Sequence, residues 1–253
     1  MTSLLNPTPI KLVIDTDPGI DDCHAIMMAF SPSDVQILGL TIVTGNASLA
    51  QGIRNAHHLL HTFQRYDIPV FREADRTVDG GQKYAPDIHG EDGSCNATRG
   101  KDIKLDLLTD GPAAVALGRL ARENSGQLVL AAIYQLTNLF LAHWLDPEFS
   151  RNIQRLLAMG GNHTIPYFEA LSSKSSYTER ITNTYYLNFL VSFEFNLKYD
   201  PLAAAIVLEE FHTKPILIPY ELTKKACLSF QFLDQMRVWV WVWVSADVPA
   251  DVG

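Results

Sequence analysis

The sequence predicts an α/β fold, a mostly parallel open sheet with helices on both faces. Short apolar runs rich in β-branched residues alternate with segments of helical apolar spacing between residues 10 and 223. The chain has 253 residues, 47% of them hydrophobic, which suffices for one sizeable core. Polar motifs follow several expected strands, and such sheets bind ligands at the carboxyl ends of their strands. We therefore expect a single domain over residues 1–253.

The first expected strand and helix lie within residues 11–30, KLVIDTDPGIDDCHAIMMAF. An apolar run at residues 10–14 suits a buried strand, and Pro18 and Gly19 then turn the chain. Asp21 and Asp22 precede apolar residues spaced as on one helix face, and acidic residues are favoured at a helix start. The stretch therefore predicts a strand, a tight turn and a helix.

The same patterns predict the elements that follow. We expect strands at residues 36–43, 68–71, 127–133, 155–159 and 214–223, and helices at 48–63, 111–124, 136–145 and 200–211. His57 and His61 are expected on the solvated side of the 48–63 helix. The polar segment 72–103 is expected to be a long functional loop.

Two segments do not fit the alternation. Residues 162–192 form a polar and aromatic insert without clear periodicity. The tail at residues 230–253 contains the uncharged, β-prone run VWVWVWV, which is an aggregation hazard where it is exposed.

Composition bounds the partners and the compartment. The formal charge of −8 and a pI near 5.4 argue against non-specific binding to nucleic acid or to an acidic membrane. No apolar run is as long as a membrane span, and the first residues lack the pattern of a signal peptide. The three cysteines are odd in number and form no CxxC pair, so we expect a reduced, cytoplasmic protein.

Four carboxylates, at Asp15, Asp17, Asp21 and Asp22, crowd the end of the first strand. Without a cation they would repel each other and some would bind protons, whereas a hard divalent metal with oxygen ligands relieves the repulsion. A solvated acidic turn would explain Asp21 and Asp22. It explains Asp15 poorly, because Asp15 directly follows a buried strand. The cluster therefore indicates a metal or catalytic site.

Residues 14–26, IDTDPGIDDCHAI, resemble the signature of the inosine-uridine-preferring nucleoside hydrolases. Further blocks follow in the order found in that family, at residues 43–46, 88–93, 136–138, 159–161, 193–196 and 200–201. The resemblance covers residues 10–223. It implies a nucleoside hydrolase-like fold and hydrolysis of the N-glycosidic bond of purine or pyrimidine ribonucleosides to ribose and free base by a calcium-bound water. It also suggests an assembly of two or four copies.

The resemblance also implies a role for individual residues. Asp17 corresponds to the general base and a calcium ligand, Asp22 to a bidentate ligand, and Ile133 to a residue whose backbone carbonyl binds the metal. Asp15 corresponds to a supporting acid beside the metal. The remaining matches concern the nucleoside: Asp21 at a ribose hydroxyl, Asn46 holding the ribose and Asp21, Met159 under the sugar, His89 in a mobile loop near the base, and Asn188, Glu194 and Asn196 at ribose-binding positions.

The sequence departs from the family at three places. Tyr134 and Gln135 stand where a small Gly-Pro-like step is usual, and the insert at residues 162–192 enlarges the loop that should carry ribose contacts. A late His-Asp-Pro block, which carries a third carboxylate ligand, is not found. We therefore expect a C-terminally truncated or divergent member with impaired hydrolysis.

Two alternatives stay open. One is a catalytically inactive relative with a binding or structural role. The other is a magnesium-dependent phosphohydrolase of the haloacid dehalogenase type, which also has Asp-x-Asp after its first strand. That class needs Ser or Thr where Gly19 stands.

Overall fold

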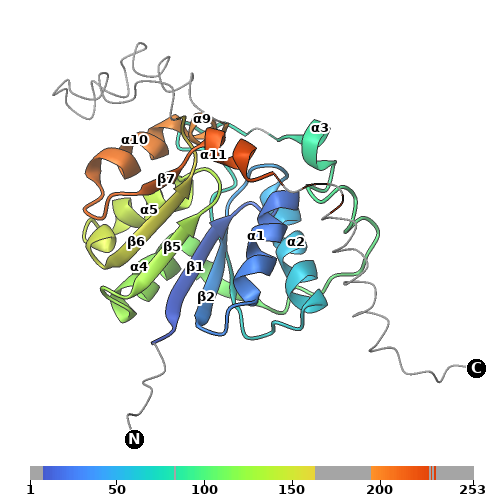
Figure 1. Cartoon of the computed structure of the whole chain (residues 1–253), viewed down its shortest axis with the longest axis horizontal. Helices are drawn as coiled ribbons and strands as arrows, with labels where there is room; N and C mark the ends of the chain where they lie inside the picture. Colours follow the sequence, from blue (N-terminus) through green and yellow to red (C-terminus); the bar gives the residue numbers. More distant parts are fainter. Residues whose placement is uncertain (1–7, 83, 163–194, 228, 230, 232–253) are drawn as a thin grey trace, which may run out of the picture.

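Seven parallel strands form the sheet in the computed structural model, which describes residues 8–82, 84–162, 195–227, 229 and 231 (Figure 1). The strand order is β4-β3-β2-β1-β5-β6-β7. The strands are β1 (Ile10–Thr16), β2 (Val35–Ile42), β3 (Val70–Arg72), β4 (Leu108–Pro112), β5 (Leu128–Ala132), β6 (Ile153–Met159) and β7 (Ile216–Ile218). All six strand pairings are parallel, which confirms the predicted fold class.

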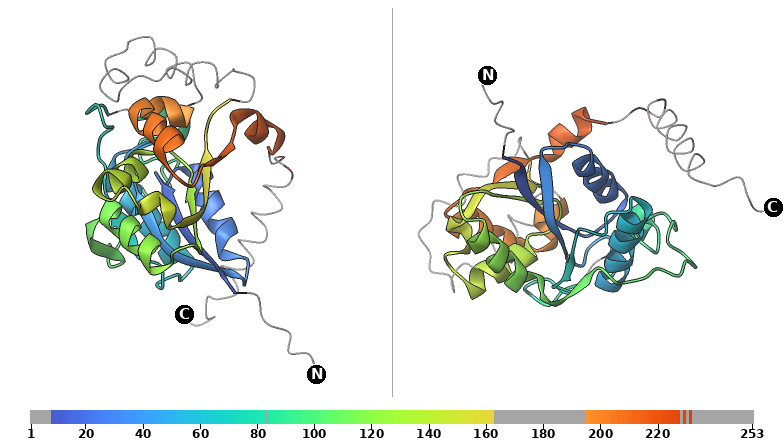
Figure 2. Two further views of the ribbon diagram at one scale, coloured as in Figure 1. Left: turned by 90° about the vertical axis from the view of Figure 1, so that its left-hand side faces the viewer. Right: turned by 90° about the horizontal axis from the view of Figure 1, so that it is seen from below.

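Helices cover both faces of this sheet (Figures 1 and 2). The apolar sides of α1 (Ile20–Phe30) and α2 (Leu49–Thr62) pack on one face. The other face is covered by α4 (Ala113–Glu123), α5 (Thr137–Leu145) and α10 (Pro201–Glu210). Val13 and Ile14, adjacent in β1, belong to the two different cores, because successive side chains of a strand point to opposite faces. Burial on both faces explains why the strands are almost continuously apolar.

The direction of strand addition reverses at β1. Successive strands after β1 add on one side as far as β4, and β5, β6 and β7 then add on the other side. In register, Asp15 of β1 lies between Thr41 of β2 and Ala132 of β5. Open α/β sheets bind ligands at the carboxyl ends of the strands at such a reversal, where the two connections diverge. The acidic cluster therefore lies at the position that the topology favours for a site.

Local capping explains where several helices begin. The Ser48 hydroxyl accepts a hydrogen bond of 3.3 Å from the Gln51 N–H at the start of α2. The Asp200 carboxylate accepts one of 3.2 Å from the Ala203 N–H at the start of α10, and Pro201 occupies the first turn of that helix. These caps lie within two residues of the predicted helix starts.

Five helices and strands differ from the predictions. The predicted strand at residues 214–223 is wrong in its second half, because Pro219 ends the short strand β7 and precedes the helix α11 (Tyr220–Lys225). The edge strand β4 was not predicted, since LTDGP has no β-branched apolar run. The short helices α3 (Pro86–His89) and α9 (Phe195–Tyr199) are also unpredicted.

One prediction for side-chain placement is wrong. His57 is buried in α2 and not solvated, and its Nδ1 lies 2.7 Å from the Ile53 carbonyl oxygen. Burial lowers the pKa of His57, so this side chain is neutral and structural. His61 is partly exposed, and its Nε2 lies 2.8 Å from Asp106 Oδ1.

All three cysteines are free, as expected. Among the described residues, no helix is both long enough and apolar enough to cross a bilayer. The insert after Asn162 and the tail, apart from residue 231, lie outside the described residues.

Candidate active site

The predicted acidic cluster lies at the carboxyl end of β1. Asp15 is within the strand and Asp17 follows it directly, whereas Asp21 and Asp22 belong to the first turn of α1. Asp15, Asp17 and Asp22 are buried, and Asp21 is exposed. The turn through Pro18 and Gly19 therefore brings three buried carboxyl groups to one edge of the sheet.

Asp15 is held from both sides of β1. Its Oδ1 accepts hydrogen bonds from Thr41 Oγ1 at 2.6 Å and from Asn138 Nδ2 at 2.8 Å, while its buried Oδ2 accepts none. Burial raises the pKa of Asp15 to about 7, although both hydrogen bonds act in the opposite direction. This geometry suits the supporting role that the resemblance implies.

Asp17 and Asp22 lie beside one another. Asp17 Oδ2 accepts a hydrogen bond from the Asn46 N–H, and Asp17 Oδ1 is buried without a donor. Asp22 accepts hydrogen bonds from Thr16 Oγ1 at 2.6 Å and from the Gly19 N–H at 3.3 Å. Burial raises the pKa of both groups, with repulsion between neighbouring carboxylates adding to the effect: the pKa of Asp22 rises to about 7, and that of Asp17 well above its ordinary range. The two carboxyl groups therefore have no positively charged group beside them, in the described part of the chain, that would favour their ionised forms.

These side chains fit a bound cation, because a cation would supply the missing charge and occupy the oxygens that have no donor. The Ile133 carbonyl, also expected as a ligand, accepts a 3.2 Å hydrogen bond from Asn196 Nδ2, and a carbonyl oxygen has a second lone pair. In the described part of the chain, no group of three or more His, Cys, Asp or Glu side chains is arranged to hold a metal ion. A cation here would therefore depend on two carboxylates and on neutral oxygens.

Asn46 and His89 come together at the turn after β1. Asn46 is buried, and its Oδ1 has no hydrogen-bond donor. His89 Nδ1 lies 4.0 Å from Asp21 Oδ1. A Cβ at Gly19 would lie 2.6 Å from Asn46 Nδ2 and 3.0 Å from His89 Nδ1, so only glycine allows this close approach. The structure thus brings Asn46, Asp21 and His89 together at the turn after β1.

The loop that carries His89 is organised by Asp92. The Asp92 carboxylate accepts hydrogen bonds from the N–H groups of Ser94, Asn96 and Thr98 and from the Thr98 hydroxyl. Burial alone would raise the pKa of Asp92, but these hydrogen bonds outweigh it and lower the pKa to about 2. Asn55 of α2 connects this loop to the turn after β1, because its Nδ2 donates to the carbonyl oxygens of both Asp92 and Pro18.

Asn196 connects two strands at the same edge. Its Nδ2 donates to the carbonyl oxygens of Ile133, which follows β5, and of Met159, the last residue of β6, at 3.2 and 3.1 Å. Asn196 is in α9, whose position is therefore tied to the ends of both strands. The predicted ribose-binding residues Asn188 and Glu194 lie outside the described residues.

Tyr134 was noted in the sequence only as a departure from the family pattern, and the structure shows what it contacts. Its ring packs edge to face on Tyr199, with 5.6 Å between ring centres, and on Phe195 at 6.3 Å. The ring also lies against the backbone of Gly45, where a Cβ would overlap both Tyr134 Cε1 and Asp17 Oδ2. Tyr134 and Gly45 therefore cover Asp17, which is only 2% exposed.

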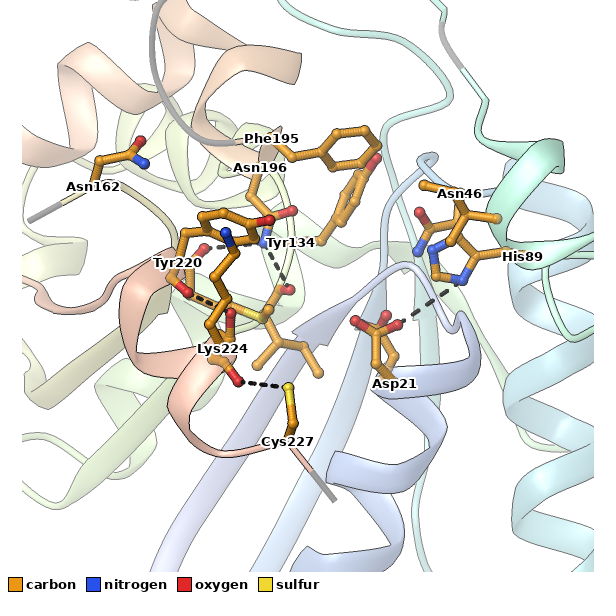
Figure 3. A pocket seen from close by; sticks show the side chains of 15 residues that line it. Asp21, Asn46, His89, Tyr134, Asn162, Phe195, Asn196, Tyr220, Lys224 and Cys227 are labelled. Atoms are coloured by element: carbon orange, nitrogen blue, oxygen red, sulfur yellow. Dashed lines mark hydrogen bonds and ion pairs between the residues drawn. The ribbon is translucent and has the colours of Figure 1, made fainter. Parts of the chain in front are cut away.

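A cavity of about 740 Å³ opens in front of these residues (Figure 3). Eight of its lining residues were not among the predicted site residues. Four of these come from α11 and the residues after it: Tyr220, Thr223, Lys224 and Cys227. Their spacing of three, four and seven residues is that of one helix face, and this was the signal available in the sequence. The other lining residues are Asp21, Asp22, Asn46, Ile88, His89, Ile133, Tyr134, Met159, Asn162, Phe195 and Asn196.

Comparisons with known proteins agree with the geometry. The family model described as inosine-uridine preferring nucleoside hydrolase matches residues 12–245, which extends past the resemblance seen in the sequence. The chain is 39% identical over 157 residues to the probable uridine nucleosidase 2 of Arabidopsis thaliana, covering 60% of this chain and 47% of that protein. It is 30% identical over 227 residues to the non-specific ribonucleoside hydrolase RihC of Salmonella newport (strain SL254), covering 90% of this chain and 66% of that protein.

A solved structure gives the same result. The plant nucleoside hydrolase PpNRh1 superposes with a TM-score of 0.69 at 27% sequence identity, covering 86% of this chain and 62% of that chain. The chain thus spans less than half the length of the Arabidopsis relative and under two thirds of the solved chain.

Proposed function

Because the chain belongs to the inosine-uridine preferring nucleoside hydrolase family, we propose that it hydrolyses the N-glycosidic bond of ribonucleosides to ribose and free base. The observation that supports this proposal is the buried pair Asp17 and Asp22 beside a cavity of about 740 Å³ at the carboxyl edge of the sheet. Cavities of this size hold small organic ligands. Membership of this family favours glycosidic hydrolysis over hydrolysis of a phosphate ester.

We assign Asp17 as the base that accepts a proton from the attacking water. The Asn46 N–H holds Asp17 Oδ2 and leaves Oδ1 without a donor, so Oδ1 is the free acceptor. The water oxygen adds to C1′ of the ribose as the C1′–N bond breaks, and the transition state resembles an oxocarbenium ion. The electron pair of the broken bond goes to the nitrogen of the nucleobase, and the nucleobase then takes up a proton.

Asp17, Asp22 and the Ile133 carbonyl would hold the cation, for which we propose calcium because all three supply oxygen ligands. When bound, calcium would supply the positive charge that keeps Asp17 and Asp22 ionised at neutral pH. Asp21 and Asn46 bind the ribose hydroxyls in this proposal, and His89 approaches the base. Asn196 holds Ile133 and Met159 in place under the sugar.

One observation favours a second candidate, a relative that binds nucleosides and turns them over slowly. Tyr134 lines the cavity and its ring lies beside Asp17, whereas Asp17 is not among the lining residues and is only 2% exposed. Limited access of water to Asp17 would slow the reaction. The two candidates share the substrate class and differ in rate.

The test is ribose release from inosine and uridine, with excess calcium and with a chelator. We expect turnover that needs calcium and that falls by about 10² to 10⁴ in Asp17→Asn. Asp34→Asn, at an exposed position, is the matched control. Turnover in Asp17→Asn equal to that in Asp34→Asn would reject Asp17 as the base. If calcium binds to the wild type in a titration but no ribose release can be measured, the second candidate is favoured.

We also propose that the protein works in the reducing environment of the cytoplasm, and the three free cysteines support this.

A further inference from the structure

One positively charged side chain lies in the wall of the cavity, and the proposed mechanism does not use it. Lys224 of α11 is the single Lys or Arg among the described residues that line the cavity. Its ammonium nitrogen lies 4.6 Å from the centre of the Tyr220 ring, an arrangement that is attractive and restrains the ammonium group at the wall. In Figure 3, Lys224 and Tyr220 lie across the cavity from Asn46 and His89.

Lys224 shares the cavity with acidic side chains. Asp21 and Asp22 line the same cavity, and the whole chain has a formal charge of −8. A sugar held by its hydroxyls at Asp21 and Asn46 places the rest of the nucleoside in the remaining space. Lys224, Tyr220 and Thr223 are among the residues that line this space.

The chemistry of the departing base calls for positive charge there. When the C1′–N1 bond of uridine breaks, its electron pair stays on N1 of uracil and the negative charge spreads onto the ring carbonyl oxygens. An ammonium group close to such an oxygen stabilises this charge more in the transition state than in the substrate.

We propose that Lys224 is a catalytic residue that hydrogen-bonds a carbonyl oxygen of the departing base. The proposal rests on the proposed function and adds a side chain of this chain that stabilises the departing base. The reaction balances as uridine plus water giving ribose and uracil. One proton of the water goes to Asp17, which then releases it to solvent. Lys224 stays protonated, and the uracil anion takes up a proton from solvent.

Two substrates and three variants test the proposal. Uridine needs help for its leaving group, whereas p-nitrophenyl β-D-riboside releases p-nitrophenolate, which is stable as an anion. Lys225 is the matched control, because it is exposed on the same helix and does not line the cavity. We expect Lys224→Met to lower kcat for uridine by about 10² to 10³ and to change p-nitrophenyl riboside hydrolysis by less than about threefold. Lys225→Met should behave as the wild type, and Lys224→Arg should keep most of the activity on uridine. Equal losses on both substrates, or no loss on uridine, would overturn the proposal.

A binding measurement separates this proposal from the proposed function. 5-Nitrouracil is acidic enough to be an anion near neutral pH, so it mimics the departing base without any turnover. We expect calorimetry to show binding that is about tenfold weaker in Lys224→Met and unchanged in Lys225→Met. If the wild type hydrolyses neither substrate, the proposed function fails, and this measurement still decides the role of Lys224. Equal affinity in Lys224→Met and the wild type, or no binding by the wild type, would refute that role.

Discussion

Replacing Asp15 by Asn should change the stability of the metal-free protein in a way that depends on pH. Thr41 and Asn138 both donate to Asp15 Oδ1, and an Asn oxygen at that place keeps both hydrogen bonds. The new amide nitrogen takes the place of Oδ2, which has no partner. The substitution therefore removes a buried charge and preserves the shape.

The magnitude follows from the pKa of Asp15. Burial raises this pKa from its ordinary value of 3.8 to about 7, so the folded protein binds the proton more tightly than the unfolded chain does. Stability from this group is therefore full below pH 3.8 and falls as the pH rises to about 7. At 1.36 kcal/mol per pKa unit, the ionised carboxylate costs roughly 4 kcal/mol at pH 8. An amide N–H without an acceptor costs about 1–3 kcal/mol. Asp15→Asn should thus stabilise the protein at pH 8 by roughly 1–3 kcal/mol and give no gain at pH 4.

Urea unfolding between pH 4 and pH 8, with a chelator present, measures this difference directly. Asp34→Asn serves as the control, because its exposed carboxylate should give a small difference that does not vary with pH. A constant difference between Asp15→Asn and the wild type across this range would refute the reasoning. So would a loss of stability at pH 8.

Four further substitutions test the packing around the site and in α4. Gly45→Ala should lower the free energy of unfolding by about 1–3 kcal/mol, because its Cβ would overlap Asp17 and Tyr134; Gly118→Ala in α4, whose Cβ would meet only the flexible end of Arg122, should raise it by about 0.5–1 kcal/mol. Asp200→Ala should cost about 3 kcal/mol in urea unfolding, since it leaves Thr137 Oγ1 and the N–H groups of Val78 and Ala203 without their acceptor; a cost below 1 kcal/mol would contradict this. In the wild type, the ionised Asp92 stabilises the fold, and this contribution is lost as the pH falls from 3.8 towards 2. Asp92→Asn should lack this contribution, so its free energy of unfolding should not fall in that way over this pH range. The same substitution should speed amide hydrogen exchange at Ser94, Asn96 and Thr98 while exchange in α4 stays unchanged.

Local patterns in the sequence predicted the sheet and the acidic cluster. The strand, turn and acidic helix start around Asp17 lie within a short stretch, so the relative positions of Asp15, Asp17 and Asp22 depend mostly on local geometry. The contacts of Asn46 and His89 with that turn are long-range. The convergence of Asn46 with the acidic cluster was predicted because parallel strands end at one edge of the sheet. The approach of His89 to Asp21 was not predicted.

The missed features depend on tertiary packing. The spacing of His57 along its helix gives no sign that it differs from the partly exposed His61. The packing of α2 on the sheet buries His57. Residues 214–223 are apolar enough for a strand, and the turn at Pro219 divides them between β7 and α11. The position of Tyr134 against Asp17 requires Gly45 from a different loop, and no periodicity in the sequence reports such a contact.

The packing of Gly45 against both Asp17 and the Tyr134 ring ties the identity of residue 45 to the carboxylate and not to the ring. A Cβ at position 45 would overlap Asp17 Oδ2 whatever residue stands at position 134. Selection should therefore retain glycine at position 45 for as long as Asp17 is kept. Position 134 carries no such constraint from Gly45, so smaller side chains there should occur among descendants beside the same glycine.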